Sequence, residues 1–171
     1  LRRMNDFPGA EKALAPARKN TFNAMTENLA AKIKRDLKDP KAAIGIYQAG
    51  LKRFGDSRAL SYGYAETLIE TNESKQALAF LADRLLLTSS DADLYDLQGK
   101  AYAAQGKKLL QHQSLAEAYI RIGNTSAAVD QLEIAARSGD GDYYQQSSVE
   151  ARLKELRAQL VAEKSAKQKP N

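Results

Sequence analysis

A single histidine limits the chemistry that this chain of 171 residues could carry out. His112 has no second histidine at the four-residue spacing that a zinc-protease helix uses. Because the sequence contains no cysteine, it offers neither a thiol nucleophile nor a Cys-His metal site. We expect His112 to lie in a large-residue position of its helix, facing the preceding helix. We predict no catalytic residue, no metal site and no enzyme activity in this chain.

The clustered carboxylates have a structural interpretation as well. Asp91 and Asp93 stand at a predicted helix start, where carboxylates cap free backbone amides. The run Asp140-Gly141-Asp142 is similar to the opening of a calcium loop, but it lacks the spacing and the terminal glutamate of such loops. The glycines are too widely spaced to form a phosphate-binding loop. We therefore predict no cofactor.

Composition excludes several partner classes. No apolar run approaches the roughly 18 residues of a membrane-spanning helix, so we predict a soluble domain without direct membrane insertion. The formal net charge is +5, but the tyrosines follow helical spacing and do not alternate with lysine and arginine as in a base-stacking surface. We expect no nucleic-acid binding. We expect protein or peptide ligands.

One segment has small and large apolar residues at the spacing of two paired helices. They are Leu115, Ala116, Tyr119, Gly123, Ala128, Leu132 and Ala135, and their spacing resembles the tetratricopeptide repeat (TPR) pattern. Small residues at 116 and 128 allow two helices to cross closely, and the large residues fill the space between them. Gly123 suits the positive φ at a helix end, and Asn124-Thr125 supplies turn and cap chemistry.

Weaker copies recur at about 34-residue spacing. The copy at 64–81 has Asn72 in place of the turn glycine, and another runs from Tyr95 to Gly106. A degenerate copy is carried by Ala31, Ala43 and Tyr47. Gly106 and Gly123 are separated by only half a repeat. A helix at 109–122 should therefore follow directly on the helix at 92–105 and also begin the next hairpin.

These patterns predict an all-α, TPR-like superhelix, a right-handed solenoid of helical hairpins with a C-terminal capping helix. The repeats should occupy 21–142, beginning with a helix at 21–37. After the break at 138–142, apolar residues at helical spacing predict the capping helix at 143–164. The basic tail at 165–171 should be disordered. Residues 1–20 receive no assignment, because Pro8-Gly9 indicates a turn and Pro16 an interruption.

The predicted binding surface is the groove lined by the first helix of each repeat. Helical periodicity places residues outside the motif positions there. They are Tyr62, Glu66, Ile69, Glu70, Asp96, Lys100, Ala103, Gln113, Glu117, Ile120 and Arg121. Their mixed charge does not form a dense basic clamp for a C-terminal carboxylate.

Residues 58–160 resemble a narrower family. The runs that carry the resemblance are Asp96–Gly106 before the half-repeat, His112–Tyr119, Gly123–Leu132 and Tyr144–Arg157. In this order they resemble the C-terminal TPR domain of BepA-like periplasmic zinc metalloproteases of Gram-negative bacteria. The first fifty residues add little to this resemblance.

The resemblance implies a parent protein with an HExxH protease domain, which would hold the zinc ion, and a periplasmic location. It also implies a role in the assembly and quality control of outer-membrane β-barrel proteins. The TPR domain would then recruit or position barrel clients and contact the barrel assembly machinery. The alternative is a free-standing or differently fused TPR scaffold in cell-envelope assembly or secretion.

Overall fold

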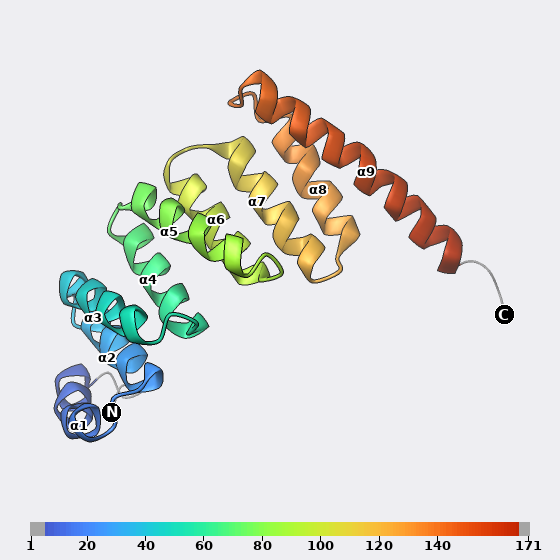
Figure 1. Cartoon of the computed structure of the whole chain (residues 1–171). Coiled ribbons are helices and arrows are strands. Elements are labelled where there is room, and N and C mark those ends of the chain that lie inside the picture. Colours follow the sequence, from blue (N-terminus) through green and yellow to red (C-terminus); the bar gives the residue numbers. More distant parts are fainter. Residues whose placement is uncertain (1–5, 168–171) are drawn as a thin grey trace. The chain divides into compact units, whose positions relative to one another are not determined.

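The computed structural model describes residues 6–167 and contains only helices over that range (Figure 1). The helices divide between two compact units, Leu1–Glu73 and Ser74–Asn171. The first unit contains α1 (Phe7–Asn20), α2 (Ala24–Asp36), α3 (Pro40–Arg53) and α4 (Arg58–Glu70). The second contains α5 (Ser74–Leu87), α6 (Ala92–Ala104), α7 (Lys108–Arg121), α8 (Thr125–Ala136) and α9 (Tyr143–Lys167). The predicted all-α class is confirmed.

Local sequence signals set the helix ends. The Asp91 carboxylate caps α6 by accepting from the Asp93 amide, and the Asn124 side chain caps α8, as predicted. Helices α2, α4, α6 and α7 end with a residue at positive φ, namely Lys38, Asn72, Gly106 and Gly123. In each case the amide of this residue and the next amide donate hydrogen bonds to carbonyls of the last helical turn, which is the pattern of a Schellman motif.

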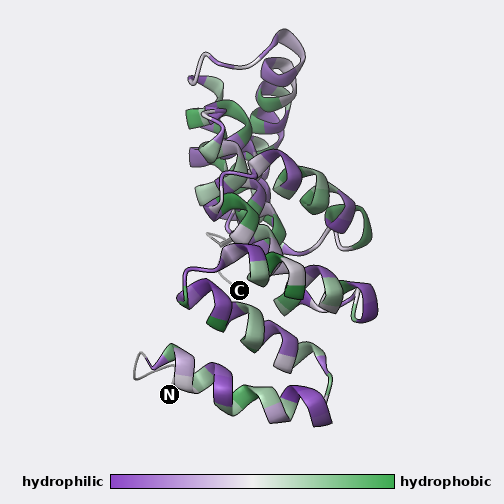
Figure 2. Ribbon diagram, turned by 90° about the vertical axis from the view of Figure 1, so that its left-hand side faces the viewer, coloured by the Kyte–Doolittle hydropathy of each residue, from purple (hydrophilic) through white to green (hydrophobic). Residues whose placement is uncertain are grey.

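Small residues let the helices of each unit pack closely. In the first unit α3 packs against both α2 and α4, and its predicted core residues Ala43 and Tyr47 are fully buried. In the second unit α7 packs against both α6 and α8, and Ala116 and Ala128 are fully buried between α7 and α8. Hydrophobic and hydrophilic residues are interspersed along the helices (Figure 2).

The N-terminal stretch is a helix, contrary to the turn and the interruption expected from its prolines. Pro8 lies in the first turn of α1, where a missing amide costs no hydrogen bond, and Asp6 caps the helix through the Gly9 amide. The helix also continues through Pro16. Residues 1–5 lie outside the described part of the chain.

The loop before α9 joins two helix starts. The Asp140 carboxylate accepts from the Lys108 and Leu109 amides at the start of α7. Asp142 and Gln145 bond reciprocally as a capping box for α9. Gly141 gives Leu109 room here, because a Cβ atom at this position would lie 2.2 Å from the Leu109 Cδ1 atom and force that side chain to move.

Helix α9 packs on α8 through Val149, Leu153 and Leu156, which complete the buried cluster of this unit. It continues to Lys167, beyond the predicted end at 164, so residues 165–167 of the expected disordered tail are helical. Residues 168–171 lie outside the described range. None of the described helices combines the length and apolar character that crossing a membrane requires.

Candidate protein-binding surfaces

In the first unit, Arg35 of α2 bridges two predicted groove residues of α4. Its Nη1 atom lies 2.9 Å from Glu66 Oε2, and its Nη2 atom lies 2.5 Å from Glu70 Oε1. Burial works to lower the pKa of Arg35, but the bonds to Glu70 and Glu66, with the Tyr47 hydroxyl nearby, outweigh it and raise the pKa. Arg35 therefore stays charged and holds both carboxylates in fixed positions.

These residues line an open pocket of about 370 Å³ between α2 and α4. Its lining comprises Lys32, Arg35, Asp36, Lys38, Glu66 and Glu70. The sequence prediction included only the two glutamates. Lys32, Arg35 and Asp36 stand about one repeat length of 34 residues before Glu66, Ile69 and Glu70, so the repeat spacing was the signal that could have identified them.

The other predicted residues of α4 are Tyr62 and Ile69, both half-buried. The Tyr62 hydroxyl accepts from Arg58 Nε at 2.8 Å, and the Arg58 guanidinium lies 5.7 Å from the ring centroid. Beneath this helix the Tyr47 hydroxyl is buried and makes no hydrogen bond within the described part of the chain. Its burial raises the pKa of Tyr47.

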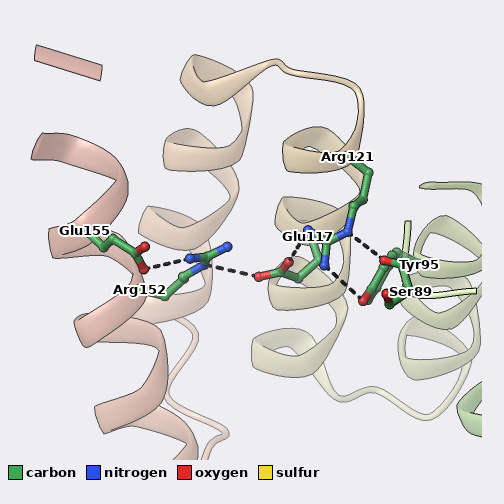
Figure 3. Close-up of polar contacts among 6 residues, drawn as sticks. All are labelled: Ser89, Tyr95, Glu117, Arg121, Arg152 and Glu155. Atoms are coloured by element: carbon green, nitrogen blue, oxygen red, sulfur yellow. Dashed lines mark hydrogen bonds and ion pairs between the residues drawn. The ribbon is translucent and has the colours of Figure 1, made fainter. Parts of the chain in front are cut away.

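In the second unit, Glu117 of α7 joins two arginines (Figure 3). Its carboxylate lies 3.0 Å from Arg121 Nη1 and 3.3 Å from Nε of Arg152 on α9. Arg121 also donates to the Ser89 carbonyl at 2.7 Å and stacks 5.0 Å from the Tyr95 ring centroid. A hydrogen bond to Glu155, with Glu117 close by, raises the pKa of Arg152. One network therefore connects α6, α7 and α9.

The predicted residues of α6 lie elsewhere. Asp96 pairs with Lys100 at 2.6 Å, and Ala103 is exposed. Asp96 lines a mainly apolar pocket of about 190 Å³ together with Ala92, Asp93, Leu115, Ala118, Tyr119 and Ile122. Helical geometry puts Leu115 and Ile122 on the side of α7 away from Glu117. The pocket that Asp96 lines therefore does not include Glu117 or Arg121.

The two remaining predicted residues of α7 are only partly accessible. Ile120 packs against the hydrophobic cluster of the second unit, and Gln113 is half-buried. The sequence missed Tyr95 and Arg152 as partners of this surface. No local pattern signals them, because their contact with α7 depends on how the helices pack.

His112 corrects one expectation. Its Nδ1 atom lies 2.8 Å from Oε1 of Gln131 on α8, so the side chain faces the following helix and not the preceding one. Across residues 6–167 no group of His, Asp and Glu side chains is arranged to hold a metal ion.

Comparison with known proteins assigns the repeats. Residues 35–101 match a family model described as a tetratricopeptide repeat. MamA from Desulfovibrio magneticus RS-1 superposes with a TM-score of 0.62, and the superposition includes 92% of this chain and 89% of the MamA chain. The chain has a TPR fold. TTC0263, a thermophilic TPR protein of Thermus thermophilus, gives a TM-score of 0.56, with coverage of 91% of this chain and 93% of that one.

Sequence identity over these TPR structures is only 18% and 17%, so they establish the fold alone. No curated protein sequence matches the chain. The ion pairs described above join neighbouring helices of this fold. Arg35 and Glu66 join α2 to α4, and Arg152 and Glu117 join α9 to α7. These two charged faces are the candidate binding surfaces.

Proposed function

We propose that this chain is the protein-binding TPR domain of a periplasmic zinc-dependent metalloprotease of Gram-negative bacteria. In that role it recruits or positions clients of outer-membrane protein assembly and quality control, and it contacts the barrel assembly machinery. The TPR fold supports the binding role. The sequence likeness of residues 58–160 to BepA-like proteases supports the narrower assignment.

One observation carries the binding role. Each unit presents charged groups at its surface that ion pairs hold in place, Arg35 with two glutamates in one and Glu117 with two arginines in the other. Polar groups fixed before binding lower the ordering cost of complex formation and select partners of complementary charge. Such faces suit recognition of protein ligands.

A photo-crosslinking experiment tests this function. A photo-reactive residue replaces Glu66, Lys100 or Glu117 in turn, and the protein is exposed to a Gram-negative envelope extract. Exposed Lys41 on α3 serves as the control position. We expect barrel assembly components or barrel proteins to be captured at Glu66 and Glu117 and not at Lys41. Equal capture at Lys41, or no capture at any position, would contradict the proposed surfaces.

The second candidate function is a free-standing or differently fused TPR scaffold in envelope assembly or secretion. It is favoured by the family comparison, because residues 35–101 match a general tetratricopeptide repeat model, which suits a scaffold fused to any domain or to none. The upstream reading frame distinguishes the two candidates. An HExxH helix and a signal peptide there would favour the protease, and a different domain would favour the scaffold.

A further inference from the structure

Lys38 has a backbone conformation that its residue type does not favour. Its φ is 61°, in the left-handed region, where the Cβ atom of an L-residue is crowded. The equivalent positions one and two repeats later hold Asn72 and Gly106, with φ of 62° and 70°. Their turns have the same two hydrogen bonds from backbone amides to carbonyls of the last helical turn. Asparagine and glycine tolerate this conformation, so the turn itself does not call for lysine.

The charge of Lys38 is placed at the pocket of the first unit. Lys38 and Lys32 line it with Arg35, Asp36, Glu66 and Glu70. Both glutamates are engaged by Arg35, and Asp36 also has an interaction. Neither Lys32 nor Lys38 forms an ion pair with any residue in the described range 6–167. The cations available to a ligand are therefore these two ammonium groups.

We propose that Lys38 and Lys32 bind the carboxylate of an aspartate or glutamate side chain in the protein ligand. This inference rests on the proposed protein-binding function and specifies the chemistry of the partner at one pocket. A strained residue that persists where an unstrained one would fit indicates a role for its side chain. The role available to Lys38 is to supply positive charge at the rim of this pocket.

A side-chain carboxylate fits better than a chain terminus. Capture of a terminal carboxylate uses free backbone amides arranged around it. At this turn the Lys38 and Asp39 amides already donate to the Arg35 and Lys34 carbonyls. Only side-chain cations remain, and these can bind an acidic residue within a passing segment.

The test compares binding with stability in the full chain. The probe is a fluorescein-labelled, C-terminally amidated peptide in which glutamate alternates with leucine, and its partner carries glutamine at each glutamate. We expect Lys38→Gly to weaken binding of the glutamate peptide by about two- to fivefold at low salt. We expect the same change to raise the melting temperature by about 2–4 °C, because it relieves the left-handed lysine.

Matched variants separate charge from backbone. Lys38→Arg keeps the charge and should bind the glutamate peptide like the wild type. Asn72→Gly alters the same kind of turn one repeat later at a residue that does not line the pocket, and Lys41→Gln removes an exposed charge from α3. Both should leave peptide affinity unchanged.

Several outcomes would overturn the proposal. One is that the two peptides bind equally or not at all, and another is that Lys38→Gly binds the glutamate peptide as tightly as the wild type does. A third is that a glutamine peptide with a free C-terminus binds as tightly as the amidated glutamate peptide. If crosslinks at Glu66 still capture partners in such a case, the binding function stands and only the acidic specificity falls.

Discussion

At the scale of single residues, Asp140 shows how one side chain fixes the start of a distant helix. The neighbouring Ser138 hydroxyl and the Leu109 and Lys108 amides hold the pKa of Asp140 below its ordinary value. A carboxyl with a lowered folded pKa stabilises the protein above its ordinary pKa, near pH 4, and the contribution is lost as pH falls through the folded value. The start of α7 should therefore weaken in acid.

Asp140→Asn tests this dependence. We expect the variant to melt below the wild type at neutral pH, because the charge at the helix N-terminus is lost. The difference should shrink as pH falls below about 4, where the carboxyl of the unfolded wild type becomes protonated, and should vanish below the lower pKa of the folded protein. Asp130→Asn, at an exposed position of α8, is the control and should match the wild type throughout. A difference that persists unchanged in acid would contradict the role of charge.

A second residue-scale prediction concerns the attachment of α1. Glu27 of α2 is 1% exposed, and Arg18 of α1 binds both of its carboxylate oxygens, at 2.8 and 2.6 Å. Arg18→Met should lower the free energy of unfolding by about 2 kcal/mol, because it leaves a buried carboxylate without its partner. Adding Glu27→Gln should restore part of the loss. Urea denaturation measures both, and an unchanged midpoint in Arg18→Met would contradict this role.

The sequence predicts residues of this kind only where their partners are local. Asp91 and Asn124 were predicted as caps because a cap bonds to amides two or three residues ahead. Arg35 and Arg152 act on glutamates of other helices, so helix packing decides their partners. In regular repeats, equivalent positions pack in similar ways, so the repeat spacing indicates a groove position for Arg35. No local pattern indicates the partner of Arg152.

At the scale of elements, the hairpin of α7 and α8 depends on two alanines. Ala116 and Ala128 are fully buried in the core cluster, where a larger side chain would have to displace its neighbours. Ala116→Leu or Ala128→Leu should lower the free energy of unfolding by about 1–3 kcal/mol. Ala103→Leu, at an exposed position of α6, should stay within about 0.5 kcal/mol. Unchanged melting in both core variants would refute the close crossing.

Elements with strong repeat signals were predicted well, and those without them were not. The helices expected at 92–105 and 109–122 are observed as α6 and α7. Helix α1 was missed because Pro8 and Pro16 indicate breaks when taken alone. Its docking on α2 involves a buried ion pair and a second pair between Lys34 and Glu11 at 2.6 Å, neither of which has a local sequence signature. Tertiary contacts therefore hold α1 in place, and local sequence patterns do not predict such contacts.

At the scale of the molecule, the chain contains two compact units, and in repeat proteins each repeat contacts only its neighbours. A destabilising change in one unit should then act mainly on the amides of that unit. We expect Ala116→Leu to accelerate native-state hydrogen exchange in the core of α7, α8 and α9 by about 5- to 150-fold, as a loss of about 1–3 kcal/mol implies. Amides of α2 and α3 should exchange as in the wild type. Arg18→Met is the reciprocal variant and should accelerate exchange in the first unit, most of all in α1 and α2, and leave the amides of α7, α8 and α9 unchanged. If either variant accelerated both sets equally, the units would unfold as one cooperative body, and binding at one charged face would then be coupled to the stability of the other.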